Sequence, residues 1–332
     1  MQIIHDISDI LRQAQANAYR NINKAMVQAY WLVGQRIVEE NQQGEAKAAY
    51  GKSIIKNISQ ALQAEFGKGF SERNLENMRA FYLQYPISQT VSAEFQAPNF
   101  ELSWSHYQTL LRIENQQERA FYEIEAAQNN WSLRELKRQY DSALYLRLAL
   151  STEKKEILKL AQQGQRISTP QDAIKDPYIL EFLQLQQHYK YSENDLENAL
   201  IDKLEHFLLE LGKGFTFVAR QKRISFDERH FYIDLVFYNR LLRCFVLIDL
   251  KIGDLKHQDL GQIQMYVNYY DRFVKLDEEN KTIGIVLCRD KSETLVEMTL
   301  PEDNQQIFAS RYQTILPSKQ QLQTLLAQHI KE

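Results

Sequence analysis

The chain has 332 residues, 44% of them hydrophobic and 25% charged, and a formal net charge of −3. This composition is typical of a folded protein of about two domains and argues against extended disorder. No apolar run is long enough to span a membrane, and the N-terminal segment is amphipathic and acidic, unlike a signal peptide, so we expect a cytoplasmic protein. Because the chain is not basic overall, it would bind nucleic acid only through local patches.

The first half of the chain has the pattern of helices. Apolar residues recur at spacings of three and four between residues 10 and 33, which predicts one or two amphipathic helices. A second helix is expected over about 53–66, followed by a Gly-Lys-Gly turn. Ser71 is a good N-cap for a third helix, which should end before Pro86. This order is the outline of a helix-turn-helix.

In such a motif the second helix enters the major groove of DNA. Its reading side chains would be Arg73, Asn74, Asn77 and Arg79. The alternative is an ordinary helical hairpin with a solvated polar face, and spacing alone favours that alternative.

Two segments interrupt the regular pattern, one within the first half of the chain and one between the halves. Residues 86–100 contain two prolines and predict a loop, after which helices continue to about residue 150. Residues 151–177 are polar and proline-containing, which is typical of a linker. We therefore expect a helical domain over 1–150 and a second domain over 178–332.

The second domain has a different period. A helix should end at Gly212 and be followed by β-rich runs over 215–226, 230–239 and 242–251. A helix, a strand over 282–290, a helix, a strand over 307–312 and a last helix complete the order. This predicts an α/β domain with a mixed sheet that is flanked by helices. Cys244 and Cys288 lie in its apolar runs, which indicates buried free thiols.

Two aspartates interrupt the apolar runs of this sheet. Asp234 lies near the end of one predicted strand and Asp249 near the end of the next, with Lys251 two positions later on the same face. Carboxylates removed from water and held close together repel each other unless a partner compensates them. A divalent cation such as Mg²⁺ would do so.

These residues carry a family resemblance. The segment from about residue 197 to 290 resembles the PD-(D/E)xK, or restriction-endonuclease-like, nuclease core. Together with the helical half, the chain resembles the YhcG-type PDDEXK nuclease family over about residues 10–317. The matching stretches include "YGKSIIKNISQALQAEFGKGFSERNL", "LSWSHYQTLLRIEN", "LENALIDKLEHFLLELGKGFTFVARQKR" and "YIDLVFYNRLLRCFVLIDLK".

The resemblance implies roles for individual residues. Asp234 would be the first motif acid, Asp249 the second, where many relatives have Glu, and Lys251 the motif lysine. Gln262 and Tyr266 match a Q-xxx-Y helix of RecB-like nucleases, in which they would orient DNA or a metal-bound water. Packing of this helix on the sheet explains the pair equally well.

An additional acid often comes from the helix before the sheet. Glu210 is our candidate for this metal ligand, and a surface carboxylate is the alternative. Glu205 and Glu197 could equally be solvated helix charges.

The hypothesis that follows is a Mg²⁺-dependent DNA endonuclease, with Mn²⁺ as a substitute ion. Asp234, Asp249 and the Leu250 carbonyl would hold the metal, and Lys251 would act electrostatically. Phosphate contacts would come from basic residues near the site, and a charged edge strand is the alternative for each of them. The candidates are Arg220, Lys222, Arg223, Lys256 and His257.

Two other functions stay open. The nuclease fold could serve as an inactive platform in a nucleic-acid-binding or oligomeric assembly protein. Alternatively, the chain could be a helical interaction protein in which the buried acids have no role beyond pairing with lysines. We expect DNA as the partner and a homo-oligomer, because cutting both strands favours a dimer.

Overall fold

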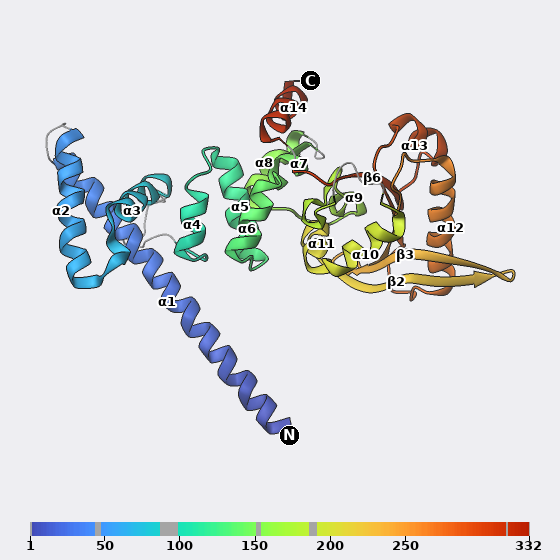
Figure 1. The fold of residues 1–332 in the computed structure, drawn as a ribbon, viewed down its shortest axis with the longest axis horizontal. Coiled ribbons are helices and arrows are strands. Elements are labelled where there is room, and N and C mark those ends of the chain that lie inside the picture. The colour runs from blue at the N-terminus through green and yellow to red at the C-terminus, as the bar shows by residue number, and fades with distance from the viewer. Residues whose placement is uncertain are drawn as a thin grey trace. The chain divides into compact units, whose positions relative to one another are not determined.

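A computed structural model describes residues 2–43, 48–86, 99–150, 154–185, 191–316 and 318–331 (Figure 1). The chain divides into two compact units, residues 1–137 and 138–332. This division falls before the predicted boundary at residue 150. The predicted linker also contributes helices α8 (Lys154–Gln163) and α9 (Pro170–Ala173) to the second unit.

The first unit is helical, as the sequence predicted. Most of the predicted loop after Pro86, residues 87–98, lies outside the described residues. The helix-turn-helix outline is present as α2, η1 and α3. The helices of this unit are α1 (Gln2–Gln43), α2 (Ala48–Phe66), the 3₁₀ turn η1 (Lys68–Phe70), α3 (Glu72–Gln84), α4 (Trp104–Leu110), α5 (Gln116–Gln128) and the start of α6 (Leu133–Asp141).

Helix α3 packs closely against the second half of α1. Its Leu75, Met78 and Phe81 are fully buried. At the crossing, a Cβ on Gly34 would lie 2.0 Å from the carbonyl oxygen of Met78, so only glycine permits this approach. The α3 N-terminus is capped by Ser71, whose side chain accepts the Asn74 amide, as the sequence predicted.

The second unit is a mixed sheet between helices. The strand order is β1-β6-β5-β4-β3-β2, with β2, β3 and β4 antiparallel and β4, β5, β6 and β1 parallel. The elements not yet given are α7 (Leu144–Leu150), β1 (Tyr178–Ile179), η2 (Glu181–Leu183), α10 (Glu193–Asp202), α11 (Leu204–Leu211), β2 (Phe215–Phe226), β3 (Arg229–Asn239), β4 (Cys244–Leu250), α12 (His257–Phe273), β5 (Ile283–Cys288), α13 (Glu293–Thr299), β6 (Ile307–Gln313) and α14 (Lys319–Lys331).

The predicted element order is confirmed apart from two differences. Strand β1 was not anticipated, because two residues are too few to show a period of two. The single helix expected before Gly212 is two helices, α10 and α11, which meet at Lys203.

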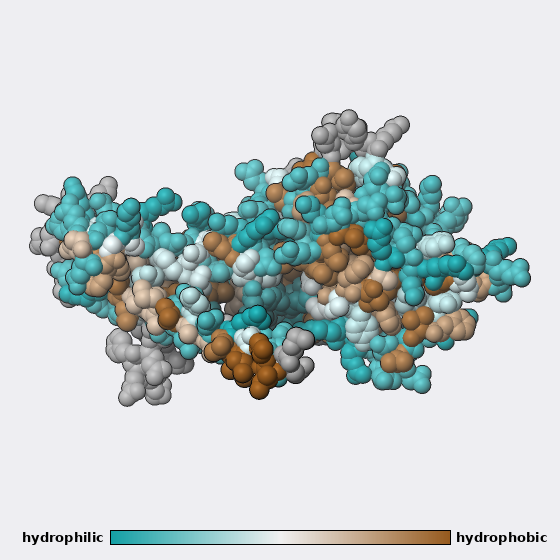
Figure 2. Space-filling view, turned by 60° about the horizontal axis from the view of Figure 1, so that its bottom comes forward, coloured by the Kyte–Doolittle hydropathy of each residue, from teal (hydrophilic) through white to brown (hydrophobic). Residues whose placement is uncertain are grey.

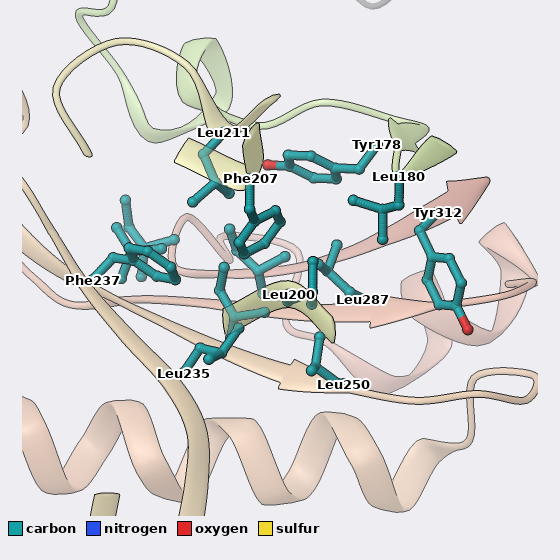
Figure 3. Packing of buried hydrophobic residues seen from close by; sticks show 14 of the residues in the cluster. Tyr178, Leu180, Leu200, Phe207, Leu211, Leu235, Phe237, Leu250, Leu287 and Tyr312 are labelled. Atoms are coloured by element: carbon teal, nitrogen blue, oxygen red, sulfur yellow. The ribbon is translucent and has the colours of Figure 1, made fainter. Parts of the chain in front are cut away.

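Each face of the sheet has its own core. On one face, α11 places Phe207 and Leu211 over Leu235 and Phe237 of β3 (Figure 3). On the other, α12 covers the sheet, and apolar side chains along one of its sides are buried there. Cys244 and Cys288 are buried free thiols, as expected. None of the described helices is both long and apolar enough to cross a membrane.

Candidate active site

The predicted acids lie where strands β3 and β4 separate. Their backbone pairing ends at Leu235 and Ile248, one position before the aspartates would face each other. Beyond that point the Asp234 side chain replaces the missing backbone acceptor, because its Oδ2 accepts the Leu250 N–H at 2.7 Å. Asp234 is therefore held at a fork in the sheet by the strand that carries Asp249.

Asp249 is almost fully buried, with 1% of its surface exposed. Burial raises the pKa of its carboxyl to about 7, although the Lys251 ammonium lies 2.8 Å from Oδ2 and opposes the shift. The charge of Asp234 raises this pKa further.

The Lys251 ammonium lies near two carboxylates, those of Asp249 and Glu193. Burial lowers its pKa, but Asp249 and Glu193 outweigh burial, so the net shift is upward. Glu193 Oε2 lies 3.8 Å from Nζ. Lys251 is therefore a cation at neutral pH.

Two residues that were not among the predicted site residues complete the cluster. Glu197 of α10 is 2% exposed, so the interpretation of it as a solvated charge was wrong. Gln221 of β2 donates its side-chain amide to Glu197 Oε2 and, at 3.1 Å, to Asp234 Oδ1. Burial raises the pKa of Glu197; the Gln221 hydrogen bond opposes this shift and the nearby Asp234 charge adds to it.

Gln221 adopts an unusual backbone conformation. Its φ is +44° in the middle of a strand, between residues that pair regularly with β3. A residue with a Cβ adopts this left-handed region at a cost of about 1–3 kcal/mol, and such costs are concentrated at functional sites. The sequence gives no sign of this conformation. For Glu197, the signal was its position beside the apolar Leu196 and Leu200 on the same helix.

The chemistry of the cluster suits a hard metal ion. Within the described ranges, Glu197 Oε1 and Asp249 Oδ2 are buried without a hydrogen-bond partner, although Arg220 lies at ion-pair distance from the first oxygen and Lys251 from the second. Carboxylate oxygens are the ligands that Mg²⁺ prefers. No group of three or more His, Cys, Asp or Glu residues is already gathered as a metal site in the described part of the chain. The Gln221 amide lies between two of the acids.

Glu210 is not available as a metal ligand, so this prediction is corrected. Its carboxylate is fully buried, accepts Arg147 Nη1 at 2.7 Å and lies 3.5 Å from Arg138 Nη1. It also accepts the Ile179 N–H at 2.9 Å. Burial opposes ionisation, but Arg147, Lys175 and Arg138 outweigh it and lower the pKa of Glu210 to about 2. The alternative of a surface carboxylate is wrong for the same reason.

Gln262 and Tyr266 share one face of α12, as predicted. Tyr266 is 1% exposed, and its hydroxyl donates to the Tyr232 carbonyl at 3.0 Å. Gln262 Nε2 donates to the same hydroxyl at 2.6 Å. The pair thus connects α12 to β3 by a hydrogen bond two residues before Asp234. Its role in orienting DNA or a metal-bound water stays a prediction.

Basic residues accompany the cluster on the long β2–β3 hairpin (Figure 1). The pairing of β3 with β2 continues past the end of its pairing with β4. Arg220 is exposed, with Nε 3.7 Å from Glu197 Oε1. Lys222 and Arg223 are exposed on the same strand. Since β2 is an edge strand of the sheet, this position suits both phosphate contacts and protection of the edge. Lys256 and His257, which begin α12, are exposed as well.

The side chains of α3 that were predicted to read DNA differ from one another in their surroundings. Arg73 is exposed, Asn77 is half-buried, and Arg79 lies 3.4 Å from Glu76. The prediction for Asn74 is corrected. Its oxygen accepts Trp104 Nε1 at 2.9 Å and Gln108 Nε2 at 2.8 Å, and its nitrogen donates to the Gly69 carbonyl at 2.6 Å. These bonds hold the turn and α4 to α3. They occupy both acceptor positions of the Asn74 oxygen, which a bidentate contact to adenine would need.

Comparison with known proteins decides the family. Residues 6–147 match the DUF1016 N-terminal domain, and residues 171–327 match the YhcG PDDEXK nuclease domain. The Escherichia coli (strain K12) protein named "Putative nuclease YhcG" is 39% identical over 347 residues, which cover 97% of this chain and 92% of that protein.

The chain belongs to the YhcG family. This confirms the resemblance seen in the sequence, and it assigns the second unit to the PDDEXK nuclease domains. Asp234, Asp249, Lys251 and Glu197 all lie within the part that matches the YhcG nuclease domain.

Solved structures share only a weak likeness with this chain. A repair endonuclease from Pyrococcus abyssi has 17% identity and a TM-score of 0.27, over 39% of this chain and 50% of that chain. EndoMS in a complex with dsDNA has 15% identity and a TM-score of 0.27, over 41% and 51%. At these scores the likeness supports no argument about the site.

Proposed function

We propose that this protein is a Mg²⁺-dependent nuclease that hydrolyses phosphodiester bonds in DNA, with Mn²⁺ as a substitute ion. The observation that carries the proposal is the fork between β3 and β4, where Asp234, buried Asp249 and Lys251 converge. A fold gains no stability from a carboxylate whose pKa is raised by burial, so this arrangement indicates a ligand.

Asp234, Asp249 and the Leu250 carbonyl would hold the metal, and Glu197 takes the place that we had given to Glu210. A bound Mg²⁺ supplies an acidified water and charge compensation at the scissile phosphate. Lys251 stays protonated beside Asp249, so it donates to and neutralises a phosphate oxygen and does not act as a general base. Tyr266 fixes the strand that carries Asp234.

DNA would be bound by local patches of positive charge. Arg220, Lys222 and Arg223 stand on the hairpin beside the acids, where phosphates would pass. Arg73, Asn77 and Arg79 of α3 provide a second patch in the helical unit. Two copies of the chain would present two sites, which is what cutting both strands needs.

One observation favours a second candidate function. The 2.8 Å contact between Lys251 and Asp249 is also what a structural ion pair would make. In that case the fold would bind nucleic acid or assemble without cutting it. The strained backbone of Gln221 has no explanation under this candidate, and Glu197 Oε1 has no hydrogen-bond partner, with the exposed Arg220 3.7 Å away.

A cleavage panel tests the proposal. Linear, branched and single-stranded DNA and RNA are incubated with Mg²⁺, Mn²⁺ or EDTA, using wild type, Asp234→Asn and the control Asp227→Asn. Asp227 is exposed at the hairpin turn with φ +50°, a conformation that asparagine tolerates. We expect metal-dependent DNA cleavage by wild type and control and none by Asp234→Asn. No cleavage of any substrate, with no metal effect on melting, would favour the second candidate.

Salt titrations test the α3 patch. Replacing Arg73 and Arg79 by Ala should weaken DNA binding and reduce the slope of log K against log salt by about 2. The matched pair Lys222→Ala and Arg223→Ala should have a similar effect from the nuclease unit. An unchanged slope for the α3 variant would leave the helical unit as an assembly domain.

A further inference from the structure

A row of four aromatic rings runs from the β2–β3 hairpin to the last turn of α12. The hairpin supplies Phe231 and Phe226, which stack with ring centroids 5.0 Å apart. Helix α12 supplies Tyr269, 6.3 Å from Phe226, and Phe273, 5.3 Å from Tyr269. Phe231 and Tyr269 are half-buried and pack against the core on this face of the sheet. These two rings therefore complete the core.

Phe226 and Phe273 are left exposed instead, with 36% and 72% of their surface in contact with solvent. Phe226 comes two positions after the buried Ile224, so its side chain lies on the α12 side of the hairpin. Figure 2 shows brown and tan side chains among teal ones toward the right-hand end of the molecule, where the hairpin projects in Figure 1. Exposed apolar rings with a polar rim are typical of a binding surface.

Cations flank the exposed rings. Arg229 is the register partner of Phe226, and Lys222 lies on the same side of the hairpin, since its own register partner packs into the core there. Arg272 directly precedes Phe273. All three cations are exposed, and none makes an ion pair with another described residue. The rings therefore lie among positive charges that the fold leaves without a partner.

One end of the row lies close to the proposed active site. Phe231 precedes Asp234 by three residues of the same strand, which is about 10 Å at 3.4 Å per residue. Two acids of the hairpin, Asp227 and Glu228, form its turn on the far side of the rings. A polyanion that leaves the site along the hairpin thus meets Lys222 and the rings before it meets these acids. One strand could therefore occupy the site and the rings together.

We propose that Phe226 and Phe273 stack on unpaired bases of the strand whose phosphate enters the site, an inference that rests on the proposed function. Aromatic side chains bind single strands by stacking on the flat faces of bases, and cations beside them hold the backbone. In a duplex these faces are covered by neighbouring base pairs, so a protein reaches them only where the duplex is open. The preferred substrate would carry a single-stranded segment next to the cut. Because every base has such a face, its sequence would not matter.

Binding to labelled oligonucleotides in EDTA tests this without cleavage. The probes are a single strand, the same strand with abasic positions, and the duplex of the same sequence. In the full-length chain, Phe226→Leu/Phe273→Leu keeps apolar contacts but removes both rings. It should weaken binding of the single strand about tenfold and change duplex binding by less than about twofold.

The salt dependence separates stacking from charge. The slope of log K against log salt should be the same for wild type and the leucine variant, because no phosphate contact is lost, whereas Arg229→Ala should reduce the slope by about 0.7. Met298, 79% exposed in the same unit, provides the control Met298→Ala, which should change neither affinity nor slope.

A tryptophan probe makes the test independent of any loss of packing. Trp31, Trp104 and Trp131 all lie in the helical unit, so Phe273→Trp places the only tryptophan of the nuclease unit in the row. Its fluorescence should be quenched by the single strand and much less by the abasic strand. Equal quenching by both strands would overturn the inference. A leucine variant with wild-type DNA affinity and an altered mass in gel filtration would overturn it too, by assigning the rings to a second copy.

The outcomes also separate this inference from the proposed function. If the leucine variant binds the single strand as wild type does, while wild type still cleaves DNA with Mg²⁺, only the stacking fails. If wild type cleaves no substrate but the tryptophan at position 273 is quenched by the single strand alone, the stacking stands and the nuclease proposal fails.

Discussion

Two buried carboxylates of the nuclease unit have opposite surroundings. Glu210 contacts Arg147 and Arg138 and accepts a backbone N–H, and its pKa falls to about 2. Asp249 is buried to the same degree but has Lys251 as its main compensation, and its pKa rises to about 7. Burial alone therefore does not distinguish a structural acid from a proposed metal ligand. What distinguishes them is how completely the fold compensates the charge.

The largest expected effect is on catalysis. Asp249→Asn should reduce cleavage by at least about a thousandfold, because the metal loses a charged ligand. Its melting temperature without metal should equal or slightly exceed that of wild type, since a poorly compensated charge is removed. Melts with and without Mg²⁺ check this, and the ion should raise the wild-type value only. A variant that melts well below wild type would make Asp249 a structural ion-pair partner.

Glu210 should behave in the opposite way. Glu210→Ala should lower the free energy of unfolding by about 3–5 kcal/mol, because Arg147 would stay buried without its carboxylate. Urea unfolding measures the loss. Mn²⁺ affinity, measured by calorimetry at a temperature where the variant is folded, should be unchanged. A lost affinity would restore Glu210 as a ligand.

The two acids should also give stability opposite pH dependences. Glu210 binds its proton less readily when folded, so its stabilisation is present above pH 4.5 and is lost as the pH falls toward 2. Asp249 keeps its proton longer when folded, so the folded state loses stability as the pH rises from about 4 to 7.

Comparing Asp249→Asn with wild type isolates the contribution of Asp249 to the pH dependence of stability. In EDTA the stability of the variant relative to wild type should increase by on the order of 2 kcal/mol between pH 5 and pH 8. Urea unfolding at each pH measures it. A difference that does not change with pH would mean that Lys251 compensates Asp249 fully.

Gln221 should give the smallest effect. Gln221→Gly removes the amide between Glu197 and Asp234 and the left-handed strain, so Mn²⁺ should bind severalfold more tightly. Without metal the variant should lose about 1 kcal/mol, because two hydrogen bonds to carboxylates cost more than the strain returns. Gln221→Asn, which keeps an amide and tolerates the conformation, is the control. Weaker binding by the glycine variant would show that Gln221 assists the metal.

The sequence predicted the residues whose pattern is local. Asp234, Asp249 and Lys251 stand out because acids interrupt apolar strands, and the strand period fixes their common face. It selected Glu210 over Glu197, and the structure reverses that choice, because both acids lie on helices with an apolar face and the local pattern does not separate them. The choice depends on Arg147, which is 63 positions from Glu210 in the chain.

Asn74 was misjudged for the same reason. Its partner Trp104 comes from another helix, 30 positions later. The backbone of Gln221 was also beyond prediction, since nothing in a strand pattern marks one residue for the left-handed region. Contacts between distant segments decide these cases, and a local period does not contain them.

The hydrogen bond from the Leu250 amide to Asp234 makes the site visible to spectroscopy. That amide belongs to a central strand, yet its acceptor is a side chain that protonation or a metal would alter. Its nitrogen and proton chemical shifts should therefore follow ligand binding, while its exchange with solvent deuterium reports whether the fork is closed. In a protein labelled with ¹⁵N-leucine, the Leu250 amide signal could thus be used to follow metal binding at the site with no substrate present.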